Sequence, residues 1–126
     1  MRGVSALGEA LAAHPRADVR VLVIWLPVLE TDRGPPTETV RRPLAVDPRV
    51  AEFWDPTHWA SPRMLERAAS VDPAAARPGA VAWDLIAIYP AGATWEDPFP
   101  MPSWYGRPVV DSRKEIDQAL ERAPRR

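Results

Sequence analysis

The stretch Val19-Arg20-Val21-Leu22-Val23-Ile24-Trp25-Leu26-Pro27-Val28-Leu29 decides the fold of this chain. It is apolar without interruption from Val21 to Leu29, and it is bounded by Asp18 and Glu30. A strand with one solvent-exposed face alternates apolar and polar residues, and this run does not. It therefore predicts a strand covered on both faces, as in a parallel sheet flanked by helices. Nine apolar residues are too few to span a bilayer. We therefore expect an interior strand that ends where Pro27 removes a ladder donor.

The composition of the chain excludes several classes of protein. A length of 126 residues indicates a single domain, residues 1–126. The 16 basic and 17 acidic residues nearly cancel, and no basic stripe indicates nucleic-acid binding. The absence of cysteine excludes a disulfide, a thiolate nucleophile and a cysteine metal site within these residues. Residues 1–13 lack the long apolar core of a signal peptide, so we expect a cytoplasmic protein without a membrane segment.

In the first half of the chain, Ser5 is placed to cap a helix that ends at His14-Pro15. The inner face of this helix follows the i, i+3, i+4 rule and consists of Leu7, Ala10 and Leu11. A polar loop covers Glu30 to Pro36. The segment from Val40 to Val46 stays ambiguous because Pro43 interrupts a helix there. Asp47-Pro48 predicts a short helical turn that carries Val50, Phe53 and Trp54.

The second half predicts a helix, a strand and a last helix. Ser61-Pro62 is typical of a helix start, with Met64, Leu65, Ala68 and Ala69 inward. A loop is expected over Ala74–Gly79, and Val81–Tyr89 predicts the second strong strand. Ala93–Trp95 is expected to return as the arm of a tight hairpin. Ser112 with Glu115 predicts a capping box for the last helix, whose inner face is Ile116, Ala119, Leu120 and Ala123.

Three stretches, residues 21–32, 47–56 and 82–95, resemble a little-characterised group of bacterial thioredoxin-like proteins. The resemblance implies an α/β fold: a small mixed sheet of two parallel strands plus an antiparallel hairpin arm, flanked by helices. A thioredoxin-like fold begins with a strand that leads to its redox cysteine pair. Because the first helix begins almost at Met1, the domain resembles an N-terminally shortened member, without that strand or pair. The absent strand would lie between the two strong strands, which we expect to pair directly in parallel, with the helix over residues 61–70 covering one face.

Glu52, Asp55 and His58 lie three residues apart, so on one continuous helix they would share a face suited to acid–base work or metal binding. Pro56 breaks that helix, which favours a solvated, self-capping turn. No glycine-rich loop follows a strand, so a nucleotide site is not indicated. The sequence therefore predicts no catalytic residue, no metal ligand and no cofactor, and a hydrolase remains only a third hypothesis.

The candidate binding residues are Trp95, Trp104, Tyr105 and Asp84. The three aromatic residues lie beside a proline-rich segment and are candidates for a binding edge. Asp84 lies in the middle of the second predicted strand, where a carboxylate is costly unless a base or a loop amide pairs with it. For Asp84 we favour this structural role, as the partner of an arginine or of a loop amide, over a role in binding.

The function predicted from the sequence is that of a non-redox binding or accessory domain, whose ligand is a protein partner or a small molecule. We expect a monomer or a weak homo-oligomer that binds neither nucleic acid nor membrane. The alternative is a shortened form of a thiol–disulfide oxidoreductase whose redox cysteines lie upstream of Met1.

Overall fold

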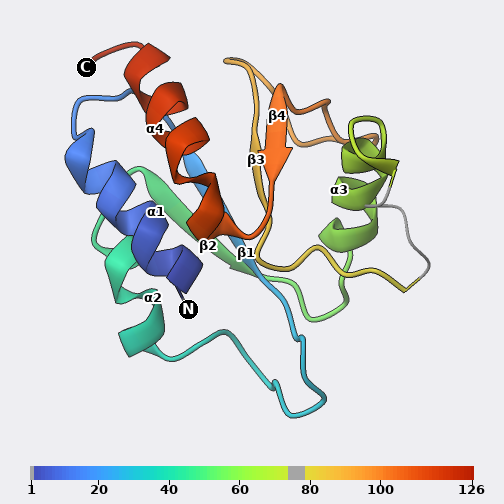
Figure 1. Ribbon diagram of the computed structural model, residues 1–126. Coiled ribbons are helices and arrows are strands. Elements are labelled where there is room, and N and C mark those ends of the chain that lie inside the picture. Colours follow the sequence, from blue (N-terminus) through green and yellow to red (C-terminus); the bar gives the residue numbers. More distant parts are fainter. Residues whose placement is uncertain (1, 74–78) are drawn as a thin grey trace.

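The computed structural model describes residues 2–73 and 79–126, so most of the loop expected over Ala74–Gly79 lies outside the described residues. The chain forms two small two-stranded sheets; in Figure 1 one sheet lies behind the first and last helices, and the other lies to the right of the last helix. In chain order the elements are α1 (Arg2–Ala13), β1 (Val21–Trp25), α2 (Glu38–Ala45), β2 (Val50–Trp54), α3 (Ala60–Ala69), β3 (Ile86–Ile88), β4 (Trp104–Gly106), the 3₁₀ turn η2 (Val109–Ser112) and α4 (Arg113–Arg122). The chain is thus an α/β protein. No helix within the described ranges is long and apolar enough to cross a membrane.

Helix α1 starts earlier than the sequence predicts. Ser5 lies inside the helix and does not cap it, because the apolar stripe continues toward the N-terminus through Val4 and Leu7. Ala10 and Leu11 are buried, as expected. The helix ends before His14, also as expected.

The strand predicted from the apolar run is present as β1, but its sheet has only two strands, so β1 is not the interior strand that the run predicted, and its partner is β2. The two strands are parallel, with Val21 opposite Val50 and Trp25 opposite Trp54. The helical turn predicted over residues 47–54 is wrong. The segment is rich in β-branched and aromatic side chains, which suit a pleated surface, and the ladder with β1 supplies its hydrogen bonds.

Helix α2 connects these two strands through the segment that the sequence left ambiguous. Pro43 lies inside this helix, in its last turn, so the helix lacks the one hydrogen bond that an N–H at this position would donate to the carbonyl of Thr39. A Cβ atom on Gly8 would come within 2.7 Å of the Pro43 carbonyl oxygen. The bare backbone at Gly8 therefore lets α1 approach α2 closely, and the neighbouring Leu44 is fully buried.

The second sheet pairs β3 with β4 in antiparallel fashion, with Ile88 opposite Trp104. The strand predicted over Val81–Tyr89 is wrong for its first half. Asp84 has a φ of 49°, in the left-handed region that an extended strand does not contain. Just before it, the N–H of Trp83 donates to the Val81 carbonyl at 2.9 Å, in a tight turn.

The hairpin arm predicted at Ala93–Trp95 is also wrong. The chain makes a longer excursion between β3 and β4, closed by the N–H of Ser103, which donates to the Ile88 carbonyl at 2.7 Å. Pro98, Pro100 and Pro102 lack the N–H groups that a ladder needs, so regular pairing begins only after the last of them.

The two sheets are separate, and this corrects the expectation that residues 21–25 pair directly with residues 82–88. Strand β1 pairs with β2 and strand β3 pairs with β4, and no ladder joins β1 to β3 in the described residues. Figure 1 shows β1 between β2 and β3.

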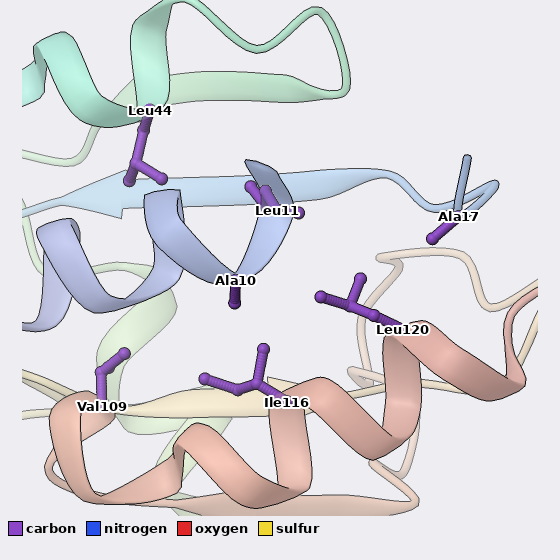
Figure 2. Close-up of a cluster of buried hydrophobic side chains, with 7 residues drawn as sticks. All are labelled: Ala10, Leu11, Ala17, Leu44, Val109, Ile116 and Leu120. Carbon is purple, nitrogen blue, oxygen red and sulfur yellow. The ribbon is translucent and has the colours of Figure 1, made fainter. Parts of the chain in front are cut away.

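One hydrophobic core nevertheless joins both sheets. It is formed by side chains of α1, α2, η2 and α4 and of the α1–β1 loop, namely Ala10, Leu11, Ala17, Leu44, Val109, Ile116 and Leu120 (Figure 2). Val21 and Val23 of the first sheet and Ile86 of the second sheet pack against this core. The two sheets therefore share one helical layer, although no hydrogen-bonded ladder connects them.

Helix α3 covers only the second sheet. Its buried Leu65 and Ala68 pack against Leu85 and Tyr105, next to and within β3 and β4. The expectation that this helix covers a sheet containing β1 is therefore not met. The inward positions predicted for Leu65 and Ala68 are confirmed.

The predicted capping serines have other roles. Ser61 is buried inside α3, and its Oγ accepts the N–H of Ala82 at 2.8 Å. Asp55 bonds the start of the helix instead, because its Oδ2 accepts the N–H of Ala60 at 2.9 Å. The Oγ of Ser112 donates to the Pro108 carbonyl at 3.1 Å, within the 3₁₀ turn that precedes α4. Because of this turn, Ser112 makes no side-chain capping bond to α4.

Candidate binding surface

Trp95 belongs to a row of four aromatic rings. Its ring centroid lies 5.9 Å from that of Tyr89 and 4.9 Å from that of Phe99, and Phe99 lies 5.3 Å from Trp59. Phe99 is only 2% exposed. The row therefore attaches the proline-rich excursion to the start of α3, where the guanidinium of Arg63 lies 4.3 Å from the centroid of Trp59.

Trp104 and Tyr105 are neighbours on β4, so their side chains leave opposite faces of the hairpin. Tyr105 packs toward α3, and burial together with its hydrogen bond to Asp72 raises the pKa of its hydroxyl. Trp104 lies over Gly106, whose hypothetical Cβ would be 2.7 Å from the indole Cζ2. The two aromatic residues do not form one continuous edge.

Asp84 occupies a third place, in the loop before β3. Its Oδ1 accepts the N–H of Val109, at 3.3 Å, and so connects this loop to η2. The partner of this carboxylate is thus a backbone N–H of the 3₁₀ turn, where the sequence predicted an arginine or a loop amide. The four predicted binding residues thus do not converge on one site.

The Glu52, Asp55 and His58 group does not converge on a common point. The carboxylate of Glu52 accepts the Trp25 indole N–H at 2.6 Å and lies 3.6 Å from the guanidinium of Arg41. The ring Nε2 of His58 lies 2.6 Å from the Pro27 carbonyl oxygen. Within the described ranges, no three His, Asp or Glu side chains are grouped so that they could hold a metal ion.

Asp55 acts at the start of α3. Burial raises the pKa of its carboxyl, but hydrogen bonds from the backbone N–H groups of Ala60, Trp59 and Thr57 and from the Thr57 hydroxyl outweigh burial, so the pKa lies below its usual value. An ionised carboxylate held by backbone donors is suited to capping the start of α3.

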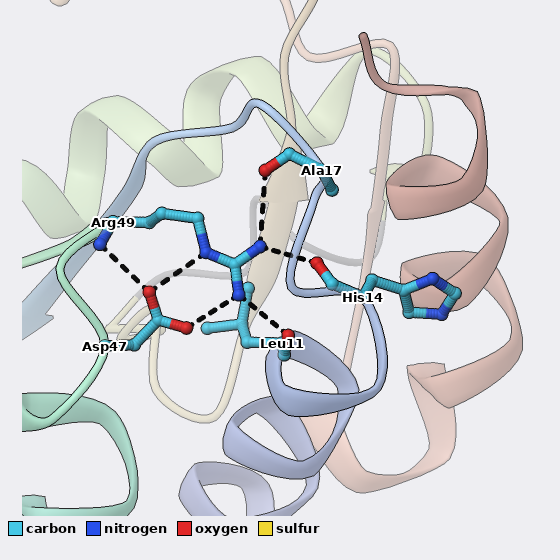
Figure 3. A network of polar contacts seen from close by, with 5 residues as sticks. All are labelled: Leu11, His14, Ala17, Asp47 and Arg49. Carbon is cyan, nitrogen blue, oxygen red and sulfur yellow. Dashed lines mark hydrogen bonds and ion pairs between the residues drawn. The ribbon is translucent and has the colours of Figure 1, made fainter. Parts of the chain in front are cut away.

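A polar network that the sequence did not predict surrounds Arg49 (Figure 3). The guanidinium donates to both carboxylate oxygens of Asp47, at 2.9 and 2.7 Å. It also donates to the carbonyls of Leu11 (2.7 Å), His14 (2.7 Å) and Ala17 (3.2 Å). The side chain of Arg49 is only 7% exposed, and its bond to Asp47 raises its pKa and lowers the pKa of Asp47. With its donors in use, Arg49 connects the end of α1 to the start of β2 and offers nothing to a ligand.

The first sheet exposes an apolar face that the sequence did not lead us to expect. On this face, which we term the open face, lie Leu22 and Ile24 of β1 opposite Ala51 and Phe53 of β2. Leu22 is 38% exposed and Phe53 is 52% exposed. Their neighbours Val21 and Val23 point to the other side, into the core. Adjacent exposed large apolar side chains on a sheet are typical of an interaction surface.

The loop after β1 adds two exposed apolar residues, Val28 (51%) and Leu29 (64%). Their N–H groups both donate to Oδ2 of Asp32 at 2.9 Å, and these bonds lower the pKa of that carboxyl. The loop is thus held by hydrogen bonds while its apolar side chains face outward.

Comparison of the chain with family models, with curated proteins and with solved structures gave no match.

Proposed function

We propose that this chain is a non-redox binding domain with a thioredoxin-like arrangement, and that a protein partner binds to its open face. The observation that carries this proposal is the exposure of Leu22 and Phe53, which lie diagonally across the two strands on one face of the first sheet. A partner that covers such side chains gains about 25 cal/mol of binding free energy for each Å² of apolar surface that it removes from water.

The order of the elements supports the thioredoxin-like part of the proposal. Two parallel strands, a helix, an antiparallel pair and a closing helix follow one another along the chain. A non-redox role is supported by the absence of cysteine from all 126 residues, because thiol exchange requires an attacking thiolate.

A photo-crosslinking experiment tests the binding surface. The crosslinking amino acid p-benzoylphenylalanine replaces Phe53 in one variant and Val46 in another, and each purified chain is irradiated in an extract of the source cells. Val46 is the matched control because it is 75% exposed but lies just beyond α2 and outside the open face. We expect one discrete adduct from position 53 that is absent from position 46. Equal, diffuse labelling at both positions would overturn the proposal.

The alternative function, that of a thiol–disulfide oxidoreductase with upstream cysteines, is tested by translating the DNA upstream of Met1 in frame and looking for a strand followed by Cys-x-x-Cys, and a separate assay tests the non-redox proposal. The 126-residue chain should not accelerate the reduction of insulin by dithiothreitol above the protein-free rate. Acceleration by this chain would contradict the non-redox proposal directly.

A further inference from the structure

A hollow of about 330 Å³ lies where the end of α3 meets β4 of the second sheet. It is lined by the residues just after α3 and by those at and just after the end of β4, namely Val71, Asp72, Tyr105, Gly106 and Arg107. Its volume equals that of roughly eleven water molecules, at about 30 Å³ each. The hollow is therefore at the lower end of the range of small-ligand sites, and it suits a molecule of about ten non-hydrogen atoms.

Two opposite charges act on the Tyr105 hydroxyl beside this hollow. Burial is the main cause that raises the pKa of Tyr105; the hydrogen bond that its hydroxyl donates to Asp72 raises it further, and the positive charge of Arg107 opposes both. The carboxylate of Asp72 and the guanidinium of Arg107 thus both lie near this one hydroxyl. The lining of the hollow carries a negative and a positive group together.

Both charged groups keep the capacity to bind a ligand. Arg107 is exposed, and within residues 2–73 and 79–126 no carboxylate lies at ion-pairing distance from its guanidinium. A guanidinium has five N–H donors, which bind a carboxylate in bidentate fashion. Asp72 accepts the Tyr105 hydroxyl, but a carboxylate offers about four acceptor positions and can bind an ammonium as well.

We propose that this hollow binds a small zwitterion, an α-amino acid with an apolar side chain. The carboxylate of the ligand binds Arg107 and its ammonium binds Asp72. Its side chain covers Val71, which is 62% exposed. This site goes beyond the proposed function and does not rest on it, because the hollow and the open face share no residue.

The combination of charges selects the ligand class. A plain carboxylate bound to Arg107 meets the like charge of Asp72, and a plain amine bound to Asp72 meets the like charge of Arg107. An α-amino acid places both of its charges on one carbon atom, so each group of the hollow meets its opposite. The apolar side chain adds affinity by removing Val71 and the ring of Tyr105 from water.

Titration of the chain with leucine, followed by its backbone amide signals in two-dimensional NMR, tests this site. We expect saturable shifts at residues 71–72 and 105–107, with a Kd of about 1 mM for so small a ligand. Isocaproate is leucine without the ammonium, and isoamylamine is leucine without the carboxylate. Each should bind roughly tenfold more weakly than leucine, because each leaves one charge of the hollow without a partner.

Variants of Arg107 test the charge on the protein side. Arg107→Gln should weaken leucine binding roughly tenfold, whereas Arg42→Gln, which changes an exposed arginine on α2, should leave it unchanged. Arg107→Glu should reverse the preference, so that isoamylamine binds more tightly than leucine. Because Arg107 is exposed, both variants should fold, and the three ligands on the wild-type chain decide the question without any variant.

Several results would overturn this inference. Leucine that causes no saturable shift at residues 71–72 and 105–107 would do so. Isocaproate that binds as tightly as leucine would show a site for a plain anion, and equal leucine binding by Arg107→Gln would remove the guanidinium from the site. None of these results changes the crosslinking expected from position 53, so failure of this site and failure of the proposed function remain distinguishable.

Discussion

The clearest test of how this fold is held together is the replacement of Arg49 by alanine. The guanidinium makes five hydrogen bonds, two to Asp47 and three to backbone carbonyls at and just after the end of α1. Arg49→Ala removes every one of them and leaves the Asp47 carboxylate, which is only 15% exposed, without its base.

The expected cost follows from this geometry. Breaking a buried ion pair by removing one partner costs about 3–5 kcal/mol, because the remaining charge stays poorly solvated. The carbonyls of Leu11, His14 and Ala17 lose charge-assisted bonds at the same time, which keeps the estimate toward the upper end of that range. For a domain of this size, such a loss lowers Tm by roughly 10–20 °C.

The pH dependence of stability gives a second readout. The bond from Arg49 holds the pKa of Asp47 below its usual value, so the folded state binds this proton less readily than the unfolded state does. The resulting stabilisation is present above the ordinary carboxyl pKa of about 4 and is lost as the pH falls through the lower folded value. In Arg49→Ala this part of the acid dependence should disappear.

Urea unfolding followed by circular dichroism measures both effects, at pH 7 and across the range from pH 5 to 2.5. Arg42→Ala is the matched control, because Arg42 is an exposed arginine on α2 and should change stability by less than about 0.5 kcal/mol. Arg49→Lys should fall between wild type and alanine, because an ammonium cannot make the bidentate contact. A loss below about 1 kcal/mol for Arg49→Ala would refute this account of the network.

Two further predictions concern β4. Gly106→Ala should cost about 1–3 kcal/mol, because its Cβ would collide with Cη2 and Cζ2 of the Trp104 indole, whereas Gly34→Ala, which meets nothing within 4 Å, should be nearly neutral. Trp104→Ala should cost about 2 kcal/mol by itself, since the ring is only half-buried. The double variant should be more stable than additivity predicts; strict additivity would show that the two positions do not touch.

The apolar run that begins at Val21 predicted β1, because the apolar side chains with which a strand packs on a core can be recognised in the sequence of that strand alone. The first and last helices were predictable for the same reason, through stripes such as Leu7, Ala10 and Leu11. The segments that were assigned wrongly are those whose secondary structure depends on a strand elsewhere in the chain. Val50–Trp54 looks helical next to Asp47-Pro48, and only the ladder with β1 makes it a strand.

The interactions that define the sites were hidden because they join distant residues. Arg49 reaches residues 32 to 38 positions away, and no local pattern distinguishes it from the other arginines. The open face was missed for a related reason. A continuous apolar run predicts that both faces of β1 are covered, and only the placement of α3 over the second sheet shows that one face is not.

Because the molecule has two separate sheets, the helices that pack against both of them set how the sheets are placed relative to each other. Because no ladder joins β1 to β3, their spacing depends on α1, η2 and α4, and on two polar links. Arg49 connects β2 to the end of α1, and Asp84 connects the loop before β3 to η2.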